Sequence, residues 1–180
     1  ASGDLWVTFS LDNGITWTNP QIIVSGNGNQ STFSVILCHD DSLRLFYASD
    51  ETGLYKIYSQ ASVDGLNWGN KKNIDLGWPS GQQFYDPHVI SEPDGQLSMT
   101  YVLMGGGACV AQTNEEGVWD TLKTIVQPQA YRARLCKHFS GDYLIIFHYR
   151  DCNNNYNIYT AMSQNFYSWD SLTQITDNNN

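Results

Sequence analysis

The chain has 180 residues, of which 41% are hydrophobic and 15% charged, a composition that predicts one folded domain with its own core and not a disordered segment. It carries 9 Lys and Arg against 18 Asp and Glu, a formal net charge of −9, which argues against duplex DNA or an anionic membrane as the main partner. No apolar run reaches the roughly 18 residues of a membrane-spanning helix.

Four tryptophans reveal an internal repeat. Trp17, Trp68, Trp119 and Trp169 are spaced 51, 51 and 50 residues apart, and a fixed period of about 50 residues is typical of propeller blades. We therefore divide the chain into four segments, 1–26, 27–77, 78–127 and 128–180.

Each full segment predicts the same order of strands. Residues 27–77 begin with VILCHDDSLRLFY, two alternating strands around a polar turn, which is a hairpin pattern. The strand YKIYSQAS and a Ser-x-Asp turn follow. Residues 78–127 and 128–180 repeat this order with VISEPDGQLSMTY and RLCKHFSGDYLIIF. The sequence thus predicts an all-β fold of four-stranded antiparallel blades, about 3.5 blades in all, with only the third and fourth strands of a blade in residues 1–26.

A short phrase ends at each repeated tryptophan: SLDNGITW, SVDGLNW, TNEEGVW and SQNFYSW. These phrases resemble the Asp box, S-x-D-x-G-x-x-W, of BNR-repeat β-propellers such as the sialidases. The first phrase matches every defined position and the others are altered copies. The resemblance covers nearly the whole chain and implies a structural set of Ser10, Asp12, Gly14, Trp17, Ser62, Asp64, Trp68, Trp119, Ser163 and Trp169.

The box chemistry itself is that of a turn. An Asp side chain can accept hydrogen bonds from backbone N–H groups of its own turn, Gly supplies a positive φ, and Trp packs between neighbouring sheets. In the family the boxes lie away from the central funnel. We therefore expect Asp12, Asp64, Glu115 and Asn165 to stabilise the fold and not to react.

Candidate site residues lie at the start of the innermost strands, which converge on the propeller axis. Aligning the repeats on their turns places FYDPHVI over AYRARLC. This alignment pairs Tyr85 with Tyr131, Asp86 with Arg132, and His88 with Arg134. We take Tyr85, His88, Tyr131, Arg132 and Arg134 as candidate ligand-binding residues of the funnel, and consider Asp86 separately.

Two of these residues carry the chemistry that a sugar site needs. A guanidinium such as that of Arg132 can clamp a carboxylate through two parallel hydrogen bonds. Asp86 could act as an acid, a base or an acceptor for sugar hydroxyls, and is the candidate catalytic residue. The alternative is that these charges form an ion pair between adjacent blades.

A second candidate is the phrase HYRD, whose Arg150 follows a predicted second strand. Arg150 could reach the same mouth, or it could be a solvated loop charge. Resemblance to sialidases implies a sialic acid hydrolase. Such an enzyme has three arginines, a Tyr/Glu pair that provides the nucleophile, and an Asp that acts as acid and base. Only Arg132, Arg134 and Arg150 are available for the arginines, and no Tyr/Glu pair can be assigned.

Metal and cofactor motifs are not found in the sequence. The cysteines Cys38, Cys109, Cys136 and Cys152 form no CxxC pair, and free buried thiols are the simpler interpretation although disulfides stay possible. The run of three glycines at 105–107 lacks the context of a phosphate-binding loop. We expect neither a metal nor a cofactor.

Three functions are compatible with the sequence. The first is carbohydrate recognition at the funnel mouth, to which abundant Tyr, Trp and Asn are suited. The second is a glycoside hydrolase whose remaining catalytic residues lie in blades outside this chain, and the third is a protein-binding scaffold. Because about 3.5 blades do not close a ring, we expect the rest of a longer chain or a second copy as a partner. The family resemblance favours a secreted or cell-surface location.

Overall fold

The computed structural model describes residues 3–120, 124–150, 155–170 and 172–176. Within these residues all regular structure is β, and no helix is long and apolar enough to cross a membrane. The strands are β1 (Leu5–Val7), β2 (Gln21–Val24), β3 (Gln30–Leu37), β4 (Leu43–Ser49), β5 (Lys56–Ser62), β6 (Gly69–Asn73), β7 (Phe84–Ser91), β8 (Leu97–Leu103), β9 (Gly107–Gln112), β10 (Thr124–Gln127), β11 (Ala130–Lys137), β12 (Tyr143–Arg150), β13 (Tyr156–Ser163) and β14 (Thr173–Gln174).

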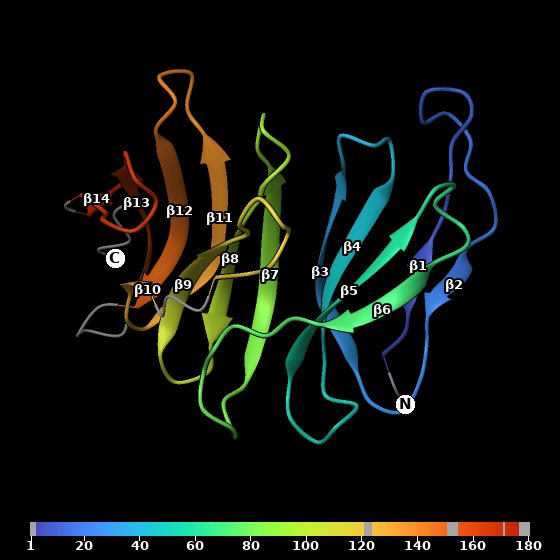
Figure 1. Ribbon diagram of the computed structural model, residues 1–180, viewed down its shortest axis with the longest axis horizontal. Coiled ribbons are helices and arrows are strands. Elements are labelled where there is room, and N and C mark those ends of the chain that lie inside the picture. The colour runs from blue at the N-terminus through green and yellow to red at the C-terminus, as the bar shows by residue number, and fades with distance from the viewer. Residues whose placement is uncertain (1–2, 121–123, 151–154, 171, 177–180) are drawn as a thin grey trace.

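The strands form one two-stranded and three four-stranded antiparallel sheets. We call the β1–β2 sheet blade 1 and the sheets β3–β6, β7–β10 and β11–β14 blades 2, 3 and 4. Strand order within each four-stranded sheet follows the chain, as in a meander. The blades stand side by side in an arc (Figure 1). The fold is part of a propeller, as the sequence predicts.

The first strand of each complete blade lines the inside of this arc. Strand β7 packs against both β3 and β11, so the three inner strands are neighbours although about 50 residues separate each from the next along the chain. Because β7 and β11 are neighbouring inner strands, their starts, where the candidate site residues lie, are close together at the same end of these strands.

The hydrophobic core lies between blades. One cluster joins Phe46 of blade 2 to Met99 of blade 3, and a second joins Val110 of blade 3 to Phe147 of blade 4. A third packs Leu5 of blade 1 against blade 2. Alternating strands bury one face against each neighbour, which explains why β8, with a blade on either side, is buried along its whole length.

The turns at 10–17 and 62–68 share one hydrogen-bond pattern. The Thr16 N–H donates to Asp12 Oδ1 (2.8 Å), and the Asn67 N–H donates to Asp64 Oδ1 (2.8 Å). The Thr16 hydroxyl also donates to Asp12 Oδ2 (2.6 Å), and this bond together with the backbone bond lowers the pKa of Asp12 to about 2. The bonds from Asn67 likewise lower the pKa of Asp64. Each tryptophan indole donates to the glycine carbonyl of its own turn. Both aspartates therefore accept hydrogen bonds within their own turns.

The other two turns depart from this pattern. In residues 113–119 it is Asn114, not Glu115, whose side chain accepts the turn's backbone N–H bonds, from Glu116 and Val118 (3.0 and 2.9 Å). The role expected for Glu115 is therefore taken by its neighbour, because this turn is a tight hairpin closed by the bridge between Thr113 and Trp119. In the last turn Asn165 accepts from the Ser168 N–H (2.8 Å).

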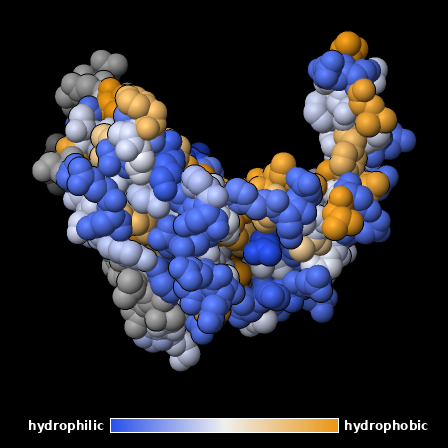
Figure 2. Space-filling model, turned by 45° about the horizontal axis from the view of Figure 1, so that its top comes forward, coloured by the Kyte–Doolittle hydropathy of each residue, from blue (hydrophilic) through white to orange (hydrophobic). Residues whose placement is uncertain are grey.

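Blade 1 leaves apolar side chains exposed. Trp6 of β1 and Ile22 of β2 are exposed, as are Phe33, Val35 and Leu37 on β3. Figure 2 shows hydrophobic residues along the arm that carries the N-terminal blade, beside a hollow in the molecule. In blades 3 and 4 the corresponding inner-strand faces contact a neighbouring blade. The exposed side of β3 therefore has the character of an interblade face without its neighbour.

The described cysteines, Cys38, Cys109 and Cys136, are all free thiols, and Cys152 lies outside the described residues. Only Cys109 is buried, so the expectation of buried thiols is wrong for the exposed Cys136. Burial raises the pKa of the Cys109 thiol to about 12.

Candidate functional site

Each inner strand contains an irregularity near its start. The register shifts between Ser31 and Phe33 in β3, and likewise after Tyr85 in β7 and Tyr131 in β11. The residues Thr32, Asp86 and Arg132 at these points have φ values of 35°, 55° and 52°. Left-handed backbone is uncommon for such residues and is typical of bulges near functional sites. Asp86 and Arg132 thus occupy equivalent positions in adjacent blades.

A pocket of about 300 Å³ opens between the starts of β7 and β11. Its lining consists of Tyr85, Tyr131, Arg132, His148 and Tyr156. We call it the funnel pocket. Tyr131 lies opposite His148 in the β11–β12 ladder, so the sheet itself places both side chains on one side.

Two of these residues were not singled out by the sequence reasoning. His148 begins the phrase HYRD, in which only Arg150 was named, and Tyr156 is the first residue of β13. Arg150 ends β12 and lies opposite Tyr156, with its guanidinium 5.6 Å from the Tyr156 ring centroid. Because β12 pairs with β13, Arg150 lies beside Tyr156, which lines the pocket. Arg150 therefore lies at the rim and does not line the pocket.

Asp86 and Arg134 form an ion pair between blades 3 and 4. The two guanidinium nitrogens of Arg134 donate to the two carboxylate oxygens of Asp86 at 3.1 and 3.2 Å. The Asp86 side chain is 7% exposed and that of Arg134 is 49% exposed. This is the interblade alternative that the sequence left open for these charges. Neither residue lines the funnel pocket, although Asp86 adjoins Tyr85.

The environment of Tyr85 raises the pKa of its hydroxyl. Burial raises its pKa, and the neighbouring Tyr131 and the Asp86 charge act in the same direction. Tyr85 therefore stays a neutral hydroxyl that can both donate and accept a hydrogen bond at physiological pH.

His88 also joins the two blades. Its Nδ1 accepts a hydrogen bond from the Leu135 N–H (3.2 Å), just as Ser34 Oγ accepts from the Val89 N–H (3.1 Å) between blades 2 and 3. Because Nδ1 accepts this hydrogen bond, the His88 ring is neutral and carries its proton on Nε2. His88 is therefore a blade-joining residue and lies outside the pocket lining.

We expect His88 to make the fold sensitive to mild acid. Burial lowers its pKa, and the positive charge of Arg134 adds to this, against the opposite effect of Asp86. The unfolded chain then binds a proton near the ordinary His pKa of about 6.5 while the folded chain does not. Stability is full above about pH 6.5 and falls as the pH drops from there toward the lower folded pKa. Urea unfolding at pH 7.5 and 5.5 should show this loss, and His88→Gln should reduce it.

The funnel pocket offers binding groups but no pair of carboxylates. Its described lining contains three phenols, an imidazole and a guanidinium and no Asp or Glu. In the part of the chain that the structure describes, no cluster of three or more His, Cys, Asp or Glu could hold a metal ion. The pocket can stack a ring against tyrosine and hold an anionic or hydroxylated group with Arg132.

Comparison with solved structures shows the fold. The chain matches the Hadza microbial sialidase Hz136 with a TM-score of 0.73 at 14% identity, over 95% of this chain and 40% of that one. It matches an α-L-arabinanase of Penicillium chrysogenum complexed with arabinobiose with a TM-score of 0.73 at 17% identity, over 98% and 60%. A protein of unknown function from Dyadobacter fermentans matches with a TM-score of 0.71 at 16% identity, over 95% and 52%.

These matches show a likeness in fold to propeller glycosidases and leave substrate open, since identity is low. The chain spans about half the length of these structures. No protein-family model matches the sequence, and no curated protein is similar to it.

Proposed function

We propose that the chain recognises a carbohydrate in the funnel pocket. The observation that carries this proposal is the lining itself, three tyrosines around Arg132 at the start of two inner strands. Tyrosine rings stack on sugar rings, and hydroxyl, imidazole and guanidinium groups donate to sugar oxygens. A volume of about 300 Å³ is at the lower end of small-molecule sites, which suits one or two sugar rings.

The fold comparisons support the same class of ligand. Among the matched structures, the arabinanase was solved with arabinobiose and an exo-β-1,3-galactanase variant of Phanerochaete chrysosporium with β-1,3-galactotriose. We also infer that the four tryptophan turns are Asp boxes of the sialidase type, supported by the bonds that Asp12 and Asp64 accept.

The ion pair of Asp86 with Arg134 favours sugar binding over sugar hydrolysis as the function. Glycosidases commonly use two carboxyl groups on either side of the scissile bond. Both oxygens of Asp86 already accept from Arg134, and the described pocket lining adds no carboxylate. A glycoside hydrolase stays the alternative if blades outside these residues contribute the catalytic pair, with Asp86 then the first candidate. A protein-binding scaffold is the third possibility.

Replacing Arg132 by alanine is expected to weaken glycan binding at least tenfold, about 1.4 kcal/mol. Arg132 is exposed at the pocket and forms no ion pair among the described residues, so its loss removes a donor without disturbing the core. Calorimetric titration of parent and variant with sialyllactose and arabinobiose measures the change. Lys71→Ala, which removes a cation that lines neither this pocket nor any other described one, is the matched control. Unchanged affinity in folded Arg132→Ala would contradict the site.

We propose that strands outside these residues complete blade 1 and the ring. The support is the exposed apolar side of β3 (Phe33, Val35 and Leu37) and the exposed Trp6. The rest of a longer chain is the favoured partner and a second copy is the alternative. Light scattering separates them: a closed dimer would establish the second copy, and a monodisperse monomer would exclude it.

A further inference from the structure

A second, larger cleft of about 530 Å³ lies outside the funnel, between blades 2 and 3. Strands β4, β5 and β6 form one wall, and the turn at 117–119 forms the other. Phe46 at its base contacts the Trp119 ring edge-to-face, with ring centroids 5.9 Å apart. We call this the lateral cleft. Its floor is thus aromatic and apolar, while its rim is polar.

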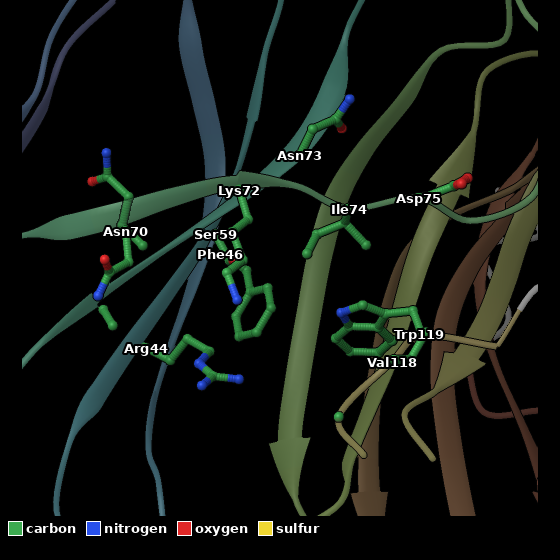
Figure 3. Close-up of a pocket in the computed structure, with 13 residues that line it drawn as sticks. Arg44, Phe46, Ser59, Asn70, Lys72, Asn73, Ile74, Asp75, Val118 and Trp119 are labelled. Carbon is green, nitrogen blue, oxygen red and sulfur yellow. The ribbon is translucent and has the colours of Figure 1, made fainter. Parts of the chain in front are cut away.

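The cationic groups of the lateral cleft stand out in a chain with a net charge of −9. Arg44 and Lys72 reach into the same space in front of Phe46 (Figure 3). Neither forms an ion pair among the described residues. The adjacent Lys71, by contrast, pairs with Glu51 and lies over the Tyr58 ring at 4.7 Å, outside the cleft.

One anion also lines the cleft, but it is partly engaged. Asp75 accepts a hydrogen bond from the Gly77 N–H (2.9 Å). Hydrogen bonds from Ser42 lower the pKa of Asp40, and the charge of Arg44 adds only a smaller effect. Asp40 lies in an exposed turn outside the lining. The two cations therefore leave the cleft with a net positive charge.

The indole N–H of Trp119 is available to a ligand. In the turns of Trp17 and Trp68 the indole N–H donates to the glycine carbonyl of the same turn. The indole N–H of Trp119, like that of Trp169, has no hydrogen-bond partner among the described residues, but only Trp119 lines this cleft. Figure 3 shows Trp119 across the cleft from Arg44, with its indole nitrogen on the cleft side.

We propose that the lateral cleft is a second carbohydrate site and that it takes an acidic sugar, one carrying a carboxylate such as a uronic acid. The sugar ring stacks on Trp119, while its carboxylate accepts from Arg44 and Lys72. The volume accommodates a disaccharide. This site is separate from the funnel pocket and does not depend on its function.

Calorimetric titration with digalacturonic acid tests the proposal, with the neutral disaccharide galactobiose and inorganic phosphate as comparison ligands. We expect digalacturonic acid to bind, galactobiose to bind at least tenfold more weakly, and phosphate not to compete at equal concentration. Arg44→Gln and Lys72→Ala should each weaken binding at least fivefold. Binding should also weaken as salt rises from 50 to 300 mM, because both contacts are ionic.

Two variants separate this site from the rest of the molecule. Lys71→Ala removes a neighbouring cation outside the cleft and should leave binding unchanged. Trp119→Phe keeps a ring but loses the indole N–H, and should weaken binding with a circular dichroism spectrum like that of the parent. Equal affinity for galactobiose, equal affinity for phosphate, or no binding of digalacturonic acid would each overturn the proposal. So would a loss of binding in Lys71→Ala equal to that in Lys72→Ala.

Discussion

Replacing Phe147 by alanine is expected to lower the free energy of unfolding by about 3–5 kcal/mol, the range for a large aromatic removed from a core. Phe147 is 1% exposed in β12, within the cluster between blades 3 and 4. Its ring also stacks near Tyr159, with centroids 6.4 Å apart. Since domains of this size are stable by only about 5–15 kcal/mol, much of the variant should unfold at low denaturant. Urea unfolding followed by tryptophan fluorescence measures the loss.

Ile146 provides the matched control for this prediction. It precedes Phe147 on the same strand but points to the other face and is 38% exposed. Ile146→Ala should therefore cost under about 1 kcal/mol, as for a partly exposed position. Similar losses at both positions would mean that the inside and outside faces of β12 are wrongly assigned, and with them the packing of blade 4 on blade 3.

The Asp86–Arg134 ion pair gives the second large effect. Arg134→Ala leaves a nearly buried carboxylate without its partner, which costs about 3–5 kcal/mol where both groups are buried. Because the Arg134 side chain is 49% exposed, solvent reaches its end of the pair and we expect a smaller loss of about 2 kcal/mol. The measurement is again urea unfolding of the parent and variant at pH 7.5.

A double-mutant cycle isolates the pair itself. Asp86→Asn removes the charge while keeping a residue type that tolerates a positive φ. The double variant should lose less stability than the sum of the two single variants, by about 1 kcal/mol or more. Strict additivity would show that the pair does not couple blades 3 and 4, and would return Asp86 to consideration as a free carboxylate of the site.

The repeat could be predicted from sequence because it rests on large, regularly spaced residues. Tryptophans in phase fixed the blade period, and the alternation of strands such as YKIYSQAS fixed which segments are extended. The equivalence of Asp86 and Arg132 also follows from aligned turns, and the matching positive φ values agree with it. These features are local in the chain or recur at a constant separation.

The partners of individual side chains could not be predicted in this way. In a regular strand Arg132 and Arg134, two residues apart, would lie on the same side. The irregularity in β11 changes this alternation, and Arg134 pairs with Asp86 instead. His148 and Tyr156 enter the funnel pocket through pairing of β12 with its neighbours. The same limit applies at Asn114, which takes the role expected for Glu115 because its turn closes more tightly.

The most direct measurement is a titration of the ¹⁵N-labelled chain with arabinobiose, β-1,3-galactotriose and sialyllactose, followed by NMR with mass spectrometry of the sugars. Recognition at the funnel pocket predicts saturable shifts at the amides of Tyr85, Tyr131 and Arg132 for at least one sugar, which is recovered intact. Cleavage with turnover would replace recognition by hydrolysis and make Asp86 the first residue to test. Shifts confined to other parts of the chain, or none with any sugar, would contradict carbohydrate recognition at this pocket.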